Sequence, residues 1–185
     1  MSTVIFSKAT TDEHIDGIVA LQQRNLPRNL TADERNVNGF LTVEHSSALL
    51  WEMNRPYRHI IALDADEVVG YALVMEKVWK DKIHVLLSMF SEIEKKLRSL
   101  KKTDLKYYVM GQICVDNEQR GKGVFRQLYK KLHDQMRAHF DLCITEIDER
   151  NQRSVQAHLA VGFKEFHRYT DEQGVNWVIV CFNYT

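Results

Sequence analysis

The chain is poor in residues that break or cross-link a polypeptide. Its 185 residues include two prolines and three cysteines, and no stretch rich in proline, glycine or serine separates two parts. The cysteines stand alone between apolar residues, without the CxxC spacing of a zinc or redox site. We therefore expect buried, reduced thiols, no bound metal ion and a single domain covering residues 1–185.

Neither sign of charge dominates, since 25 Lys and Arg residues balance 25 Asp and Glu residues. This balance excludes a global field that would draw the protein to nucleic acid or to an anionic membrane. No apolar run approaches the ~20 residues of a membrane span, and the first residues lack the cationic-then-apolar order of a signal peptide. The sequence thus predicts a cytoplasmic protein with no nucleic-acid or membrane partner.

Helical and strand-like patterns alternate along the chain. Helix signals mark five segments: 10–25, 43–54, 79–102, 123–140 and 151–162. In the third of these, Val85, Met89 and Ile93 share the apolar side. Strand-like runs fill residues 3–8, 57–76, 105–115, 141–147, 163–170 and 175–184. Strand, helix and strand in the C-terminal half imply a right-handed parallel crossover, and hairpins flank it. The predicted class is α/β (α+β), with a mixed, mostly antiparallel central sheet flanked by helices.

A glycine-rich turn, Arg120-Gly121-Lys122-Gly123, separates the strand-like run 105–115 from the helical segment 123–140. A helix N-terminus presents N–H groups and a partial positive charge, and glycine lets the backbone approach a ligand closely. The turn does not continue into the GK[ST] of a P-loop, and it lacks the third glycine of a dinucleotide-binding fingerprint. Taken alone, it is either a phosphate cradle or a solvated basic turn.

Two motifs in the C-terminal half together resemble those of the GCN5-related N-acetyltransferase (GNAT) family. The family's R/Q-x-x-G-x-G/A falls on Arg120, Gly123 and Phe125. Its N-x-x-A-x-x-x-Y-x-x-x-G-F falls on Asn151, Ser154, His158, Gly162 and Phe163. With their flanking residues, from Ile113 to Phe166, the motifs span about a third of the chain, and their order and separation are those of the family.

The resemblance implies the acyl-CoA N-acyltransferase fold, in which the parallel fourth and fifth strands splay apart. It also implies acetyl-CoA as the cofactor, with coenzyme A as the product. The pyrophosphate would bind the backbone of Arg120, Gly121, Lys122, Gly123, Val124 and Phe125. The pantetheine arm would run along Ile113, Cys114 and Val115, with Asn151 and Ser154 as further contacts. Asparagine is also a favoured helix N-cap, so Asn151 has a structural role open to it as well.

Glu146 is the candidate general base. It lies five residues before Asn151, where some family members carry a catalytic glutamate, and an attacking amine must lose a proton. The alternative is an ordinary exposed glutamate on a strand, because most glutamates are exposed. Glu76, near the end of the preceding hairpin, is a weaker candidate.

His158 stands where the family usually has a tyrosine that protonates the leaving thiolate. An imidazole with a pKa of ~6.5 could act as the acid, as the base, or as a hydrogen-bond partner of the sulfur. The alternative is a helix histidine packed beside Val155 and Leu159. This departure from the family pattern puts the standard acid step in doubt.

The resemblance implies an N-acetyltransferase that transfers an acetyl group to a primary amine by direct attack in a ternary complex. The acceptor is a small molecule or a peptide, and a homodimer is left open. The alternative is a non-catalytic acyl-CoA-binding regulatory module, which His158 and the bulky Phe125 favour. We expect the Phe125 ring to turn into the core, because it shares an apolar stripe with Leu128 and Tyr129.

Overall fold

The computed structural model describes residues 3–83 and 86–184. Val85, predicted on the apolar side of its helical segment, lies outside the described residues. The chain forms two compact units, each with its own core. We call Met1–Val74 with Met110–Met136 the N-terminal unit, and Met75–Val109 with Arg137–Thr185 the C-terminal unit.

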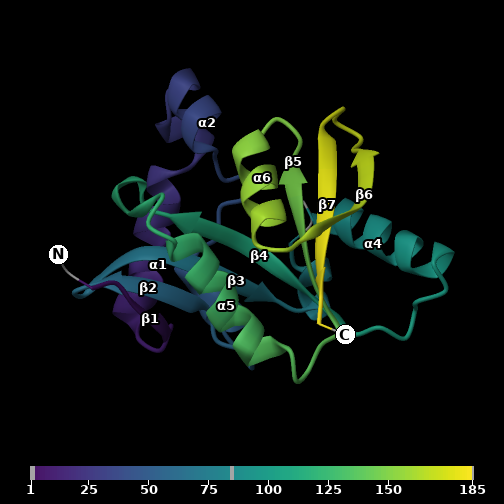
Figure 1. The fold of residues 1–185 in the computed structure, drawn as a ribbon, viewed down its shortest axis with the longest axis horizontal. Coiled ribbons are helices and arrows are strands. Elements are labelled where there is room, and N and C mark those ends of the chain that lie inside the picture. The colour runs from purple at the N-terminus through teal and green to yellow at the C-terminus, as the bar shows by residue number, and fades with distance from the viewer. Residues whose placement is uncertain (1–2, 84–85, 185) are drawn as a thin grey trace. The chain divides into compact units, whose positions relative to one another are not determined.

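The N-terminal unit is built from strands and helices that follow the predicted segments closely (Figure 1). They are β1 (Ile5–Lys8), α1 (Asp12–Arg24), α2 (Ala32–Asn38), α3 (Ser47–Met53), β2 (Ile60–Asp64), β3 (Glu67–Met75), the second part of β4 (Tyr107–Val115), the 3₁₀ turn η4 (Asn117–Gln119) and α5 (Val124–Met136). The short helix α2 was not predicted from the sequence, because it carries no apolar stripe. Its signal is local: Thr31 and Glu34 form a capping box.

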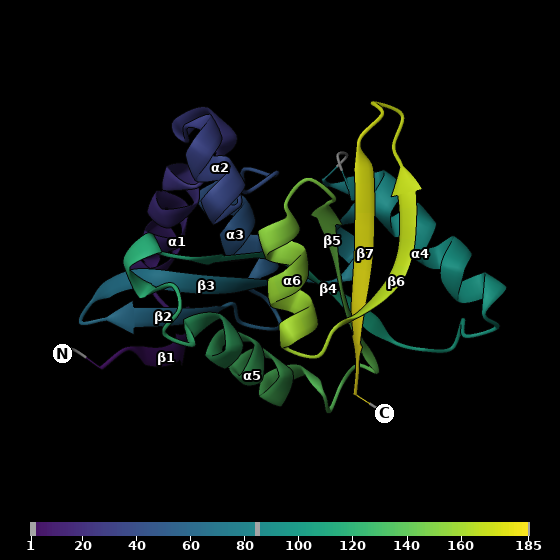
Figure 2. The same cartoon turned by 45° about the horizontal axis from the view of Figure 1, so that its top comes forward.

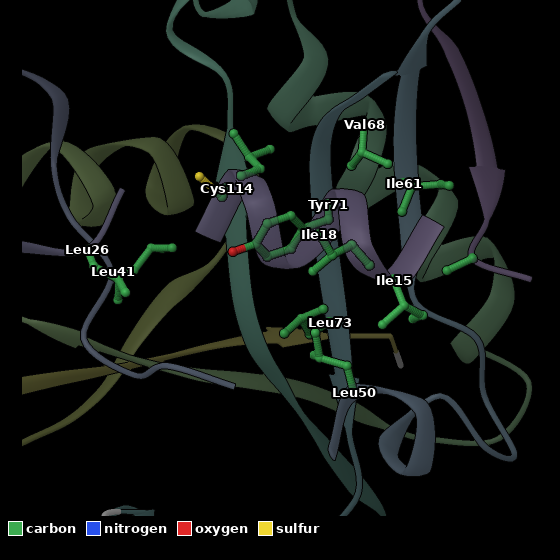
Figure 3. Close-up of a cluster of buried hydrophobic side chains, with 12 residues drawn as sticks. Ile15, Ile18, Leu26, Leu41, Leu50, Ile61, Val68, Tyr71, Leu73 and Cys114 are labelled. Carbon is green, nitrogen blue, oxygen red and sulfur yellow. The ribbon is translucent and has the colours of Figure 1, made fainter. Parts of the chain in front are cut away.

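Helix α1 packs on one face of the strands in the N-terminal unit. Its N-cap is Thr11, whose hydroxyl accepts a hydrogen bond from the His14 amide. Its buried stripe meets strand side chains in a cluster that includes Cys114 of β4 (Figure 3). The members of the cluster are Ala9, Ile15, Ile18, Leu21, Leu26, Leu41, Leu50, Ile61, Val68, Tyr71, Leu73 and Cys114.

A β-bulge in β3 sets which side chains reach this cluster. The register runs from Ala62 opposite Gly70 directly to Leu63 opposite Val68, so Val69 is an extra residue. Val68 and Tyr71, three residues apart, therefore both contribute to the cluster, which simple alternation forbids. A Cβ on Gly70 would lie 3.3 Å from side-chain atoms of Leu128 and Val124. Helix α5 thus lies against the strand where Gly70 has no side chain.

The C-terminal unit has a helix on each face of its sheet (Figures 1 and 2). Its elements are the 3₁₀ helix η2 (Lys77–Asp81), α4 (Leu87–Ser99), the first part of β4, β5 (Leu142–Asp148), α6 (Gln152–Ala160), β6 (Lys164–Thr170) and β7 (Asn176–Asn183). Helix α4 contacts β6 through Glu92 and His167. On the other face, His158 of α6 packs on Phe163, which packs on Phe182 of β7.

The predicted fold class is confirmed. Among the described residues, the strands hydrogen-bond in the order β1-β2-β3-β4-β5-β7-β6. Strands β4 and β5 are parallel, whereas β1 with β2, β2 with β3, and β7 with both β5 and β6 are antiparallel. The β4–β5 ladder covers only Tyr107–Val109 and Leu142–Ile144, although both strands run on. This short ladder is the predicted splayed pair.

Two helix boundaries differ from the sequence patterns. The helical segment predicted at 79–102 forms α4 only over Leu87–Ser99. Helix α5 ends at Met136, whereas the apolar stripe predicted a helix up to residue 140. The half-buried Phe140 ring lies beyond the helix, with its centroid 5.2 Å from that of the buried Tyr108. No helix in the described part of the chain is long and apolar enough to cross a membrane.

Candidate functional site

The glycine-rich turn of the N-terminal unit has left-handed backbone at both glycines. Gly121 has a φ of 74° and Gly123 a φ of 82°, values that side-chain-bearing residues rarely adopt. A Cβ at either glycine would meet nothing within 4 Å, so the space around this backbone is open. Glycine is therefore required here by conformation rather than by crowding. The turn leads directly into α5 at Val124.

Arg120 fastens the turn to its surroundings instead of extending into solvent. Its Nε donates to the Val115 carbonyl at 3.0 Å, and its Nη2 donates to Asn25 Oδ1 at 3.0 Å. Asn25 is the C-cap residue of α1, and sequence reasoning did not select it. The exposed Lys122 is the remaining cation of the motif, with its Nζ 3.3 Å from Gln119 Oε1. The Arg120 guanidinium thus supports the shape of the turn.

The other predicted cofactor contacts differ in how accessible they are. Gly121, Lys122 and Gly123 are exposed, Ile113, Phe125 and Ser154 are half-buried, and Cys114, Val115, Val124 and Asn151 are buried. The expectation that Phe125 turns into the core is wrong. Its ring stays half-buried and lies edge-on to Tyr129, with the centroids 5.2 Å apart. Because Tyr129 is fully buried one turn later, it takes the core position on that stripe.

Two of the three cysteines are buried, as the sequence predicted. All three are free thiols, with Cys114 and Cys143 buried and Cys181 half-buried. Burial raises the pKa of Cys114 to about 12, so its thiol stays protonated at neutral pH. In the described residues, no group of three or more His, Cys, Asp or Glu side chains could hold a metal ion.

Glu146 is the one predicted catalytic carboxylate with a strongly shifted pKa. It lies half-buried on β5, and the Tyr169 hydroxyl of β6 donates a hydrogen bond to its Oε2. The pKa of Glu146 is raised to about 7. Burial is the largest cause, the hydrogen bond from Tyr169 opposes it, and the negative charge of Asp171 adds to it. The exposed-glutamate alternative is therefore wrong for this residue. A carboxylate that titrates near pH 7 is suited to general-base work.

The weaker candidate, Glu76, has a less distinctive environment. It is half-buried at the end of β3, just before η2, and burial raises its pKa. It has no partner comparable with Tyr169 among the described residues. Its geometry does not favour it over Glu146.

Asn151 and His158, two residues of the second motif, have structural roles at helix α6. Asn151 is the N-cap, and its Oδ1 accepts from the Ser154 amide at 3.2 Å, which confirms the predicted cap. The Nδ1 of His158 lies 2.7 Å from the Ser154 carbonyl oxygen. Because a carbonyl only accepts, we assign the ring proton to Nδ1. Burial lowers the pKa of His158 to about 4, so the ring is neutral at pH 7.

Glu146 and His158 lie on opposite faces of β5. Residues paired across strands share a face, and Glu146 pairs with Ile179, which pairs with His167 on the α4 side. Cys143, which points to the other face, pairs with Phe182, whose ring contacts Phe163 beneath α6. The sheet therefore separates the candidate base from the family's acid position.

The buried, neutral His158 predicts a loss of stability in acid. An unfolded histidine titrates near pH ~6.5, so the unfolded state gains a proton before the native state does. The contribution of His158 should be complete above pH 6.5 and fall by ~3 kcal/mol on the way to pH 4. The free energy of unfolding, measured with urea at each pH, should decline less steeply toward pH 4 for His158→Gln than for wild type. The exposed His139→Gln should follow wild type, and equal slopes for all three proteins would refute the assignment.

Comparison with known proteins identifies the family. The family model described as "Acetyltransferase (GNAT) family" matches residues 28–163. The chain belongs to the GNAT family. This result confirms the resemblance first seen in the motifs at Arg120 and Asn151, and with it the class of acyltransferases. No curated protein sequence matched the chain.

Solved structures share the GNAT fold at low sequence identity. The NatC complex bound to Gag peptide and CoA matches with a TM-score of 0.68 at 14% identity, over 100% of both chains. The ribosomal-protein-S18-alanine N-acetyltransferase of Escherichia coli matches with a TM-score of 0.62 at 12% identity, over 99% of this chain and 95% of that one. The acetyltransferase yncA of Salmonella typhimurium, described with its cofactor acetyl-CoA, matches with a TM-score of 0.63 at 15% identity. The match covers 100% of this chain and 95% of that one.

Proposed function

We propose that this GNAT chain is an N-acetyltransferase that moves an acetyl group from acetyl-CoA to a primary amine by direct attack in a ternary complex. The observation that carries the proposal is Glu146, a half-buried carboxylate that titrates near neutral pH and is held by Tyr169. Acetyl transfer needs a base of this kind, whereas a binding module does not, so this group supports the enzyme. We take residues 1–185 as one acetyltransferase domain to which both units belong.

Acetyl-CoA is the proposed acyl donor, and the turn of the N-terminal unit fits its phosphates. Two left-handed glycines leave open space beside the backbone, and the first turn of α5 follows immediately. The dipole and amides of a helix N-terminus favour an anion. Lys122 adds a positive charge at the surface. The solved structures of NatC and yncA, which contain CoA and acetyl-CoA, support this choice.

In the proposed reaction, acetyl-CoA supplies an activated thioester carbonyl. An amine is mostly protonated at pH 7, so Glu146 must take up a proton before or during attack. Its pKa of about 7 leaves roughly half of the carboxylates ready to do so at neutral pH. Among the three roles left open for His158, that of general acid suits the ring least. A neutral ring with Nδ1–H donated to Ser154 has no proton to give to a thiolate.

The acceptor is proposed as a primary amine of a small molecule or a peptide. Two of the solved structures with this fold are described as acting on a ribosomal protein and as binding a Gag peptide. Peptide N-termini therefore belong in any acceptor panel beside small amines. The fold alone does not choose between them.

The proposal is tested by release of the CoA thiol from acetyl-CoA across such a panel. We expect at least one amine to accelerate thiol release in proportion to its concentration, because the amine is the attacking group. The alternative, a non-catalytic acyl-CoA-binding module, is favoured by the departure at His158. It predicts tight binding of acetyl-CoA and no acceleration by any amine. That second result would end the enzymatic interpretation.

A further inference from the structure

We propose that Tyr169 is a positioning residue, which holds the Glu146 carboxylate so that one oxygen stays available to the acceptor amine. The proposal rests on the proposed function, in which Glu146 is the base. Sequence reasoning gave Tyr169 no role, because it lies outside both motifs. Only the folded C-terminal unit brings it to Glu146, 23 residues away along the chain.

The two oxygens of the Glu146 carboxylate have different surroundings. Oε2 accepts the Tyr169 hydroxyl proton, whereas Oε1 has no hydrogen bond within the described part of the chain. The Tyr169 oxygen also lies 3.5 Å from Ser88 Oγ at the start of α4. Because the single tyrosine proton is given to Glu146, the Ser88 hydroxyl is placed to donate to the tyrosine oxygen. Fixing Oε2 in this way leaves the Oε1 lone pair to receive a proton.

Tyr169 is itself fixed by its neighbours on the α4 side of the sheet. Its ring stacks on His167, two residues earlier on β6, with centroids 6.4 Å apart and planes within 11°. His167 Nε2 in turn lies 3.1 Å from Glu92 Oε2 of α4, and Lys95 Nζ lies 2.6 Å from Glu92 Oε1. The hydroxyl therefore projects from an anchored ring, which is what a positioning group requires.

The groups around Glu146 give the direction of the expected effect. Tyr169 of β6 is the hydrogen-bond donor, Asp171 in the β6–β7 turn is the acidic neighbour, and α4 contributes the neutral Ser88. The partner on β7 is the apolar Ile179. Burial and Asp171 raise the pKa of Glu146, and Tyr169 alone opposes them. Removal of the hydroxyl must therefore raise this pKa further.

The test compares Tyr169→Phe with the matched control Tyr184→Phe. Tyr184 belongs to the same unit, and its hydroxyl lies 2.9 Å from that of Tyr108. Carboxyl ¹³C NMR of glutamate-labelled protein, with Glu146 assigned by its loss in Glu146→Gln, follows the titration without any substrate. We expect Tyr169→Phe to move the Glu146 midpoint up by about one pH unit, and Tyr184→Phe to leave it unchanged. An unmoved midpoint in Tyr169→Phe would overturn the proposal.

Kinetics supply a second, separable readout. The acid limb of kcat/KM should shift up with the NMR midpoint, which by itself lowers the rate at pH 7 about fivefold and has no effect well above pH 8. A positioning role also predicts a lower kcat on the plateau. If the NMR midpoint moves but no amine is acetylated by wild type, the contact stands and the proposed function fails. If wild type is active, but Tyr169→Phe moves neither the Glu146 NMR midpoint nor the acid limb of kcat/KM, the positioning role of Tyr169 is wrong and the proposed function stands.

Discussion

Replacement of Glu146 by glutamine is expected to lower kcat for amine acetylation by about 10²- to 10⁴-fold. Glutamine keeps the size of the side chain and can still meet the Tyr169 hydroxyl, but it cannot accept a proton from the amine. The affinity for acetyl-CoA should stay the same, because Glu146 lies on the face of β5 opposite the α6 motif residues. A loss confined to kcat separates the removal of a base from the removal of a binding contact.

The measurement is steady-state kinetics with an acceptor of low amine pKa, so that the amine does not titrate in the same range. Wild type should then gain activity with a midpoint near pH 7, the pKa of Glu146, because only the carboxylate form accepts a proton. Glu146→Gln should lose this limb. The matched control is Glu165→Gln, an exposed carboxylate of β6 that pairs with Arg168. Activity of Glu146→Gln within threefold of wild type would remove Glu146 from the mechanism.

Replacement of Gly123 by alanine should weaken acetyl-CoA binding at least tenfold. Alanine at a φ of 82° is strained by ~1–2 kcal/mol, and relief of that strain turns the local amides away. Hydrogen bonds to a charged group contribute ~1.5–3 kcal/mol each, so one lost amide contact accounts for an effect of this size. A Cβ added at position 123 would meet nothing within 4 Å, so a steric clash would not be the cause of the weaker binding.

Gly174→Ala is the matched control for Gly123→Ala. Gly174 has a φ of 79° in the β6–β7 turn, and a Cβ there would also meet nothing within 4 Å. Both variants should lose similar stability in thermal unfolding, whereas only Gly123→Ala should show weaker binding in calorimetric titration with CoA. Equal CoA affinities for the two variants would show that the glycine-rich turn is a solvated basic turn and not a phosphate site.

The fold could be predicted because its information is local. Short segments of the sequence predict the apolar stripe of α1 and the strand, turn and helix around Arg120. The bulge at Val69 was not visible, because it depends on the register between β2 and β3 rather than on either strand alone. Helix α2 was missed for a different reason: it depends on its capping box and has no apolar stripe to mark it.

The candidate site was predictable only in part. The motifs selected Glu146 and the glycines, but the contacts that give them their properties join distant residues. The Tyr169 hydroxyl donates a hydrogen bond to Glu146 across β7, and Arg120 donates one to Asn25, 95 residues away in the sequence. The strand-like run 163–170 gave no reason to select Tyr169, and a basic residue beside glycines indicated only charge. Tertiary contacts of this kind leave no periodic signal in the chain.

The most direct test of acetyl transfer follows the acetyl group itself. Wild-type protein is mixed with acetyl-labelled acetyl-CoA and an accepted amine for a single turnover, and the label is located after the reaction is stopped. Direct attack in a ternary complex predicts label on the amine, none on the protein, and little transfer by Glu146→Gln. Label that stays on acetyl-CoA with every amine, or label found on the protein, would contradict the account.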